Sequence, residues 1–134
     1  MRTAGLLGRI DLLAQPGSVA LARAYVRRLL ASVGLVDVGD IELLVGEVVA
    51  NSVKHSDSGR RRGGVVSLEV SDDGESVRVS VRDAGSARTI PQIPWQVDPL
   101  SESGRGLWMV RELSSAWGWS DDARGRVVWF KVTL

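Results

Sequence analysis

Three groups of polar or glycine residues could support chemistry, and the first lies on a predicted helix. Glu47, Asn51 and His55 recur every four residues, so they lie along one side of the helix, one turn apart. Asn51 and His55 fall beside Leu44 at the edge of an apolar stripe, and Glu47 lies just outside it. A half-buried carboxylate and carboxamide lose hydration unless something binds them. Taken alone, the pattern favours internal hydrogen bonding or a slightly different helix register, and a bound ligand is the alternative.

The second group is Asp83 with Gly85, at the end of a predicted strand. Asp83 continues the alternation of Val79 and Val81, so its carboxylate points to the core side. An ionised carboxylate only accepts hydrogen bonds, so it suits the exocyclic amine of adenine and would repel the carbonyl group of guanine. Gly85 would let a flat base approach the backbone. The alternative is an ordinary Asp-x-Gly turn that ends the strand.

The third group begins a helix predicted over about 106–115 and consists of Gly104, Arg105, Gly106 and Leu107. Free N–H groups and the dipole at a helix N-terminus bind phosphate, and Arg105 adds a cation. The Gly-x-Gly spacing alone is weakly specific, because the chain has 15 glycines. The preceding residues, 86–103, hold three prolines and no periodicity, which is typical of a functional lid or a disordered segment.

The helices that position these groups are predicted from hydrophobic periodicity. Ser18 would cap a helix over about 19–33, which Gly34 would end. A second helix, which carries the first polar group, is predicted from about Asp40 to Lys54. Its stripe has the i, i+3, i+4, i+7, i+8 spacing of a core-facing helix and consists of Ile41, Leu44, Val45, Val48, Val49 and Ser52.

Alternating residues predict the strands, at 7–14, around 66–70, around 76–82, and in a final hairpin of 117–121 with 126–134. The turn Asp72-Asp73-Gly74 would join the two middle strands, and residues 122–125 would close the final hairpin. In the last strand Val128, Phe130, Val132 and Leu134 alternate with the residues of the other face. Because the strands cluster in hairpins, the predicted fold class is α+β: a two-layer sandwich of a mostly antiparallel mixed sheet, about five strands, packed on three helices.

Length and composition limit the remaining function classes. The 134 residues are predicted to form a single domain spanning 1–134. A formal net charge of +1 provides no field that would attract nucleic acid or a membrane surface, and the absence of cysteine excludes disulfides and thiolate chemistry. The first residues show no signal peptide or membrane span, so we expect the protein in the cytoplasm.

The order of the three groups is far more specific than any one of them. Residues 47–56, 81–85 and 104–107 resemble the three boxes of the Bergerat-fold (GHKL) ATP-binding domain of gyrase-type ATPases, ATP-dependent chaperones and histidine kinases. Within that group the chain most resembles the small anti-sigma-factor serine/threonine kinases common in actinobacteria. Segments 16–23 and 117–130 extend this resemblance over nearly the whole chain.

The resemblance implies a role for each residue of the boxes. Asn51 would coordinate a Mg²⁺ ion that bridges the phosphates, and Glu47 would be the general base that accepts a proton from an attacking hydroxyl. Asp83 would bind the adenine amine beside Gly85, and residues 86–103 would form the ATP lid. That lid lacks the further glycine that many relatives carry shortly after Gly85. The phosphates would contact Lys54, Gly104, Arg105, Gly106 and Leu107.

Two function classes follow from this resemblance. The first is a kinase that uses Mg-ATP to phosphorylate a serine or threonine on an anti-sigma-factor antagonist. The alternative is a non-catalytic ATP-binding partner switch that sequesters a sigma factor or another regulator. A domain that has lost nucleotide binding is disfavoured by the intact Asn51 and Asp83. The expected partners are proteins, the antagonist or a sigma factor, without direct contact with nucleic acid or membrane, and a homodimer is left open.

Overall fold

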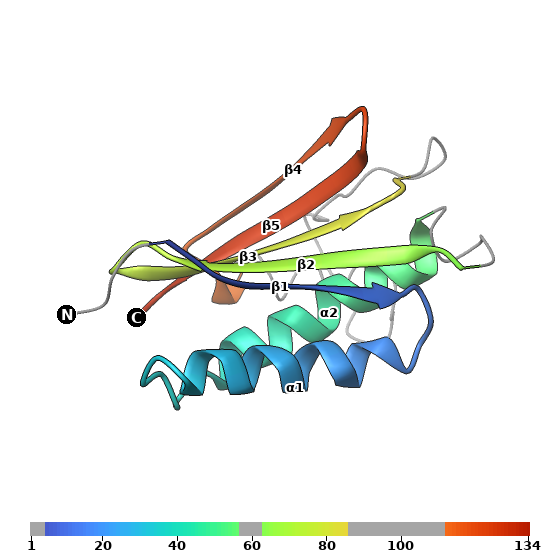
Figure 1. Cartoon of the computed structure of the whole chain (residues 1–134). Coiled ribbons are helices and arrows are strands. Elements are labelled where there is room, and N and C mark those ends of the chain that lie inside the picture. Colours follow the sequence, from blue (N-terminus) through green and yellow to red (C-terminus); the bar gives the residue numbers. More distant parts are fainter. Residues whose placement is uncertain (1–4, 57–62, 86–111) are drawn as a thin grey trace.

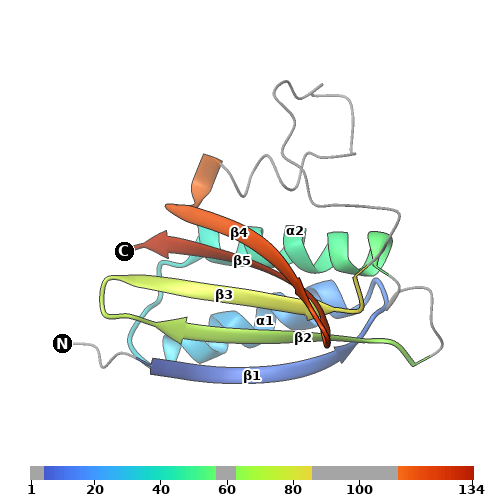
Figure 2. The ribbon, with the colours of Figure 1, turned by 90° about the horizontal axis from the view of Figure 1, so that it is seen from above.

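The fold was analysed in a computed structural model, which describes residues 5–56, 63–85 and 112–134. The elements run in the order β1 (Gly5–Leu13), α1 (Ser18–Ala31), α2 (Gly39–His55), β2 (Val65–Asp72), β3 (Ser76–Asp83), β4 (Ala116–Asp122) and β5 (Gly125–Thr133). The strands form one sheet in the order β1-β2-β3-β5-β4. Both helices lie against the same face of this sheet (Figures 1 and 2). The predicted α+β two-layer arrangement is therefore confirmed.

Two details of the predicted fold class change. The sheet is not mixed, because all four neighbouring strand pairs of the described sheet are antiparallel. This follows from topology: each strand pairs with a partner that a hairpin or a returning connection presents in the opposite direction. Of the predicted third helix only the end falls within the described residues, where Glu112 and Leu113 are helical and Ser114 is not.

Helix α1 ends where predicted but begins differently. Gly34 has a φ of +85°, its N–H bonds to the Ala31 carbonyl, and the N–H of Leu35 bonds to the Leu30 carbonyl. These two bonds satisfy free carbonyl groups at the helix end in the Schellman arrangement. Ser18 is not the cap: its hydroxyl donates to the Leu13 carbonyl instead, at 2.5 Å. The helix start is thus tied to the end of β1, and the prediction of a Ser18 cap is wrong.

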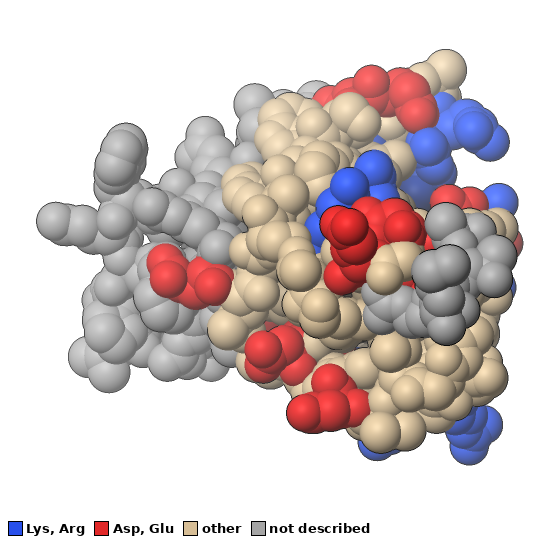
Figure 3. All heavy atoms as spheres, turned by 90° about the vertical axis from the view of Figure 1, so that its left-hand side faces the viewer, with Lys and Arg blue, Asp and Glu red and all other residues tan. Residues whose placement is uncertain are grey.

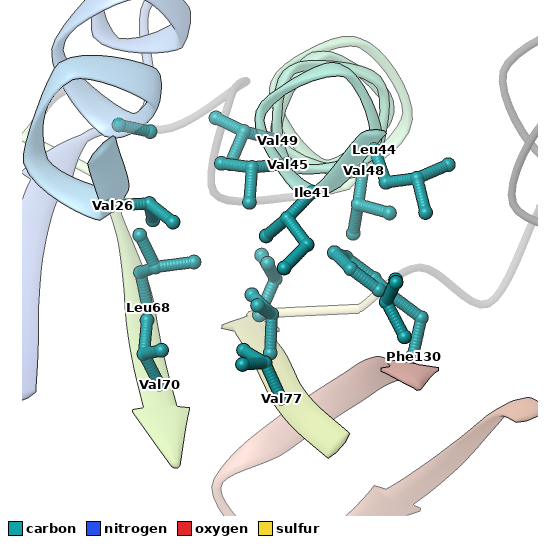
Figure 4. Close-up of a cluster of buried hydrophobic side chains, with 14 of the residues drawn as sticks. Val26, Ile41, Leu44, Val45, Val48, Val49, Leu68, Val70, Val77 and Phe130 are labelled. Atoms are coloured by element: carbon teal, nitrogen blue, oxygen red, sulfur yellow. The ribbon is translucent and has the colours of Figure 1, made fainter. Parts of the chain in front are cut away.

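Helix α2 supplies most of the core, as its spacing predicted. All six stripe residues of α2 are buried, and Phe130 of β5 is fully buried beneath it. Leu44 and Val48 lie on the Phe130 side of the helix, and Val45 and Val49 lie toward α1 (Figure 4). Each fully buried side chain of this size contributes about 1.5–3 kcal/mol. The sheet contributes alternate residues, namely Val66, Leu68, Val70, Val77, Val79, Val81, Val128 and Val132.

Both predicted hairpins are present. Asp122 pairs with Gly125, so two residues turn β4 into β5, and Asp72 pairs with Val77 across the β2–β3 turn. The last strand ends one residue earlier than predicted: β5 ends at Thr133, and Leu134 is 51% exposed. The backbone N–H of Leu134 bonds to the Glu75 carbonyl, which holds the chain end beside the turn while its side chain faces solvent.

The surface of the described residues carries both signs of charge. Viewed from the end of the molecule at which β5 ends, acidic and basic side chains lie close together and neither sign covers the face (Figure 3). The described residues also form ion pairs, such as Arg9 with Glu69 and Arg27 with Glu42. Within the described residues, neither helix is long and apolar enough to cross a bilayer.

Candidate functional site

Helix α2 meets the end of β3 at Ser52 and Asp83. The Ser52 side chain lies beside the Asp83 carboxylate and favours its charged form, and the two side chains are only 5% and 7% exposed. The backbone N–H of Gly85 donates to Oδ1 of Asp83 at 2.6 Å. Gly85 has a φ of +68°, which glycine adopts easily and other residues rarely do. The chain therefore turns sharply around this carboxylate as it leaves β3.

Opposing effects act on the pKa of Asp83. Burial raises the pKa of its carboxyl group above the ordinary value, because the charged form loses hydration. The Ser52 side chain, the hydrogen bond from Gly85 and the positive charge of Arg126 act against this rise, while the negative charge of Asp121 adds to it. A buried carboxylate supported by donors and a cation is an acceptor suited to a ligand N–H group.

Glu47 and Asn51 lie on one flank of α2, and both are half-buried as predicted. The opposite flank is closed by α1, since a Cβ on Gly46 would lie 3.0 Å from Cδ of Arg23. Glu47 and Asn51 therefore face away from α1, on the side where Leu44 lies toward Phe130 (Figure 4). Because Asn51 directly precedes Ser52, the contact with Asp83 fixes the helix turn that carries it.

The remaining predicted site residues lie at the end of α2 or outside the described residues. Lys54 is exposed near the end of α2. The backbone of His55 is helical. Gly104, Arg105, Gly106, Leu107 and the predicted lid segment 86–103 lie outside the described residues.

Sequence reasoning missed three residues that surround Asp83. Ser52 was counted within the apolar stripe, although it is the one polar member of that stripe. Arg126 of β5 is the cross-strand partner of Asp83 of β3, and it is only 8% exposed. Its position could have been found, because it continues the inward alternation of Val128 and Phe130. Gly125 packs so closely on β3 that a Cβ would lie 1.9 Å from the Asp83 carbonyl oxygen.

Comparison with known proteins agrees with this arrangement. The family model of the histidine kinase-like ATPase domain matches residues 12–132. No curated protein matches the chain significantly. The family match extends from β1 to β5 and includes both Asn51 of α2 and the Asp83 turn. The chain therefore belongs to the histidine kinase-like ATPase family, whose domains bind ATP.

Proposed function

We propose that this protein binds Mg-ATP and transfers the γ-phosphoryl group to a serine or threonine of a partner protein, an antagonist of anti-sigma factors. The buried placement of Ser52 of α2 beside Asp83 of β3 is the observation that carries this proposal. It brings the proposed base-binding carboxylate next to the helix turn that bears Asn51 and, one turn earlier, Glu47. Such a regulator would act in the cytoplasm on protein partners.

The residues at the end of β3 fit an adenine base. Asp83 offers a buried acceptor for the 6-amino group, and Gly85 has no side chain to obstruct a flat ring. Space at Gly85 is limited, since a Cβ there would lie 3.3 Å from Cβ of Arg126. Adenine presents an N–H donor where guanine presents a carbonyl, so the buried carboxylate favours ATP over GTP.

The half-buried flank of α2 fits the phosphate end of the nucleotide. The Asn51 amide oxygen would be the protein ligand of a Mg²⁺ ion, whose other ligands would come from phosphates and water, as is usual for this ion. Mg²⁺ would supply charge neutralisation of the phosphates. Lys54 would add a positive charge from the helix end. Gly104, Arg105, Gly106 and Leu107 are proposed to complete the phosphate contacts.

Glu47 is the proposed general base. Its carboxylate would accept the proton of the attacking serine or threonine hydroxyl while the new bond from that oxygen to the γ-phosphorus forms. The bond between the γ-phosphorus and the bridging oxygen breaks, and ADP leaves with the electron pair. Positioned carboxylates perform this role in phosphoryl transfer. Half-burial of Glu47 on the flank opposite α1 supports this assignment.

Transfer of labelled phosphate from ATP to purified candidate antagonists tests the proposal. We expect label on a serine or threonine of an antagonist only when Mg²⁺ is present. Antagonists can be obtained by affinity capture from the source cells, with and without Mg-ATP. If the protein binds ATP tightly and captures a partner in a nucleotide-dependent way, but transfers no label, the non-catalytic partner switch replaces the kinase.

A further inference from the structure

A buried arginine lies directly beside the proposed adenine-binding turn. Arg126 is the cross-strand partner of Asp83, and it is only 8% exposed. Its side chain runs past Gly85: a Cβ built on that glycine would lie 3.3 Å from Cβ and 3.9 Å from Nε of Arg126. The positive charge of Arg126 acts on the Asp83 carboxylate, so it is part of the immediate surroundings of this turn.

The guanidinium group of Arg126 is held from two directions. Its Nε and Nη2 atoms donate to the two carboxylate oxygens of Asp121, at 2.8 and 3.2 Å. Its Cζ atom lies 5.0 Å from the ring centroid of Trp119. A bidentate carboxylate and an aromatic face together fix both the position and the plane of an arginine. Burial of this cation is unfavourable by itself. Its fixed placement beside Gly85 therefore indicates a function.

We propose that Arg126 is a positioning residue that keeps the Asp83 carboxylate an acceptor and thereby makes the site select 6-amino purines over 6-oxo purines. This inference rests on the proposed function, because it assumes that Asp83 meets the base. Trp119 and Asp121 have an indirect part in it, since they hold the guanidinium group beside Gly85. Nothing in the family match itself assigns a role to this arginine.

The selection follows from the two protonation states of a buried carboxyl group. A carboxylate accepts a hydrogen bond from the 6-amino group of adenine, whereas a protonated carboxyl group donates and suits the 6-oxo group of hypoxanthine. Burial favours the protonated form, and the charge of Arg126 opposes it. Without that charge, the site should lose affinity for ATP and should not lose affinity for inosine triphosphate.

The test compares ATP with inosine triphosphate in titration calorimetry of the full chain with Mg²⁺. Arg126→Met keeps the long apolar stem and removes the charge. We expect the ratio of the two affinities to fall about tenfold, which corresponds to about 1.4 kcal/mol. Arg126→Lys keeps a cation at this place and should restore part of the ratio, which a purely structural role of the arginine would not require.

Arg82→Met is the matched control. Arg82 also pairs with a β4 aspartate, Asp122, at 2.7 Å, but alternation places its side chain on the sheet face away from the helices. Its loss should leave the ratio unchanged. An unchanged ratio in folded Arg126→Met would overturn the inference and leave the proposed function intact. Failure of the unsubstituted protein to bind ATP would contradict both the inference and the proposed function.

A measurement on the unsubstituted protein covers the case in which Arg126→Met does not fold. The Nε–H group of Arg126 gives its own NMR resonance, and its hydrogen bond to Asp121 slows exchange with water. We expect Mg-ATP to shift this resonance, because the base binds next to Gly85. Magnesium tripolyphosphate, which has no base, should leave it in place. An identical response to both compounds would count against the inference.

Discussion

Gly125 closes against the backbone of Asp83, and no larger residue fits there. A Cβ at position 125 would lie 1.9 Å from the Asp83 carbonyl oxygen and 3.0 Å from its carbonyl carbon. The φ angle of Gly125 is +125°, a conformation that side chains disfavour. The β4–β5 hairpin is thereby fixed against the end of β3 at the residue whose carboxylate is proposed to bind adenine.

Gly125→Ala is therefore expected to damage both stability and binding. Backbone strain of this kind amounts to about 1–3 kcal/mol, and the clash forces β5 away from Asp83. We expect the free energy of unfolding to fall by about 2 kcal/mol or more, and ATP affinity to fall with it. Denaturant titration and calorimetry measure the two effects.

Gly39→Ala is the control for this substitution. Gly39 begins α2, and a Cβ added to it would lie in open space. Alanine there should leave stability unchanged or raise it by about 0.4–1 kcal/mol. Equal stability of the two variants would show that the close approach between Gly125 and Asp83 is not a real constraint.

Asp83→Asn should separate stability from binding. Burial raises the pKa of Asp83 in the folded state, so the folded protein holds this proton more tightly than the unfolded chain. The contribution of Asp83 to stability thus declines as pH rises from about 4 through the folded-state pKa. At pH 7 the asparagine variant should be as stable as the parent or more stable.

The same variant should bind ATP about 10–100-fold more weakly, because a hydrogen bond to a charged group contributes about 1.5–3 kcal/mol. Unfolding curves between pH 4 and 8, with calorimetry at pH 7, provide both measurements. Strong destabilisation at pH 7 together with unchanged ATP affinity would assign Asp83 a structural role only.

Asp73 shows the opposite pH behaviour. Hydrogen bonds from the backbone of Ser76 and Glu75 and from the Ser76 hydroxyl lower the pKa of Asp73 to about 2. Its contribution to stability is therefore complete above about pH 4 and is lost as the pH falls toward 2. Asp73→Ala should be less stable than the parent at pH 7, and the difference should shrink in acid.

Local patterns predicted the elements because the forces that form them are local or periodic. The stripe of α2, the glycine that ends α1 and the two hairpin turns each depend on residues close in sequence. Ser18 was misassigned because an acceptor outside the helix, the Leu13 carbonyl at the end of β1, takes its hydroxyl. The preference of serine for the N-cap position does not take such a competing acceptor into account.

The site was only partly predictable for a related reason. Strand alternation identified Asp83 as an inward carboxylate, and the same rule applied two residues before Val128 would have identified Arg126. The contact of Ser52 with Asp83 could not be foreseen, because it depends on how α2 lies across β3. That placement results from packing of the whole core, above all of Phe130 against α2, and not from any local pattern.

Glu47 and Asn51 are one turn apart on α2 but should contribute differently. Asn51→Ala removes the proposed Mg²⁺ ligand and should weaken Mg-ATP binding itself. Glu47→Ala removes the proposed base and should leave binding nearly intact while phosphoryl transfer slows by about 10²–10⁴-fold, equivalent to about 3–5 kcal/mol of transition-state stabilisation. Calorimetry and transfer of labelled phosphate measure these two quantities separately.

Both side chains are half-buried on the flank of α2 opposite α1, so neither truncation should create a core cavity. Circular dichroism should show an unchanged fold in each variant, and Val48→Ala, which does open the core, serves as the destabilised reference. If loss of Glu47 leaves the transfer rate unchanged, Glu47 is not the base. If both variants lose stability alone and keep full ATP affinity, this flank of α2 supports the fold and does not bind the nucleotide.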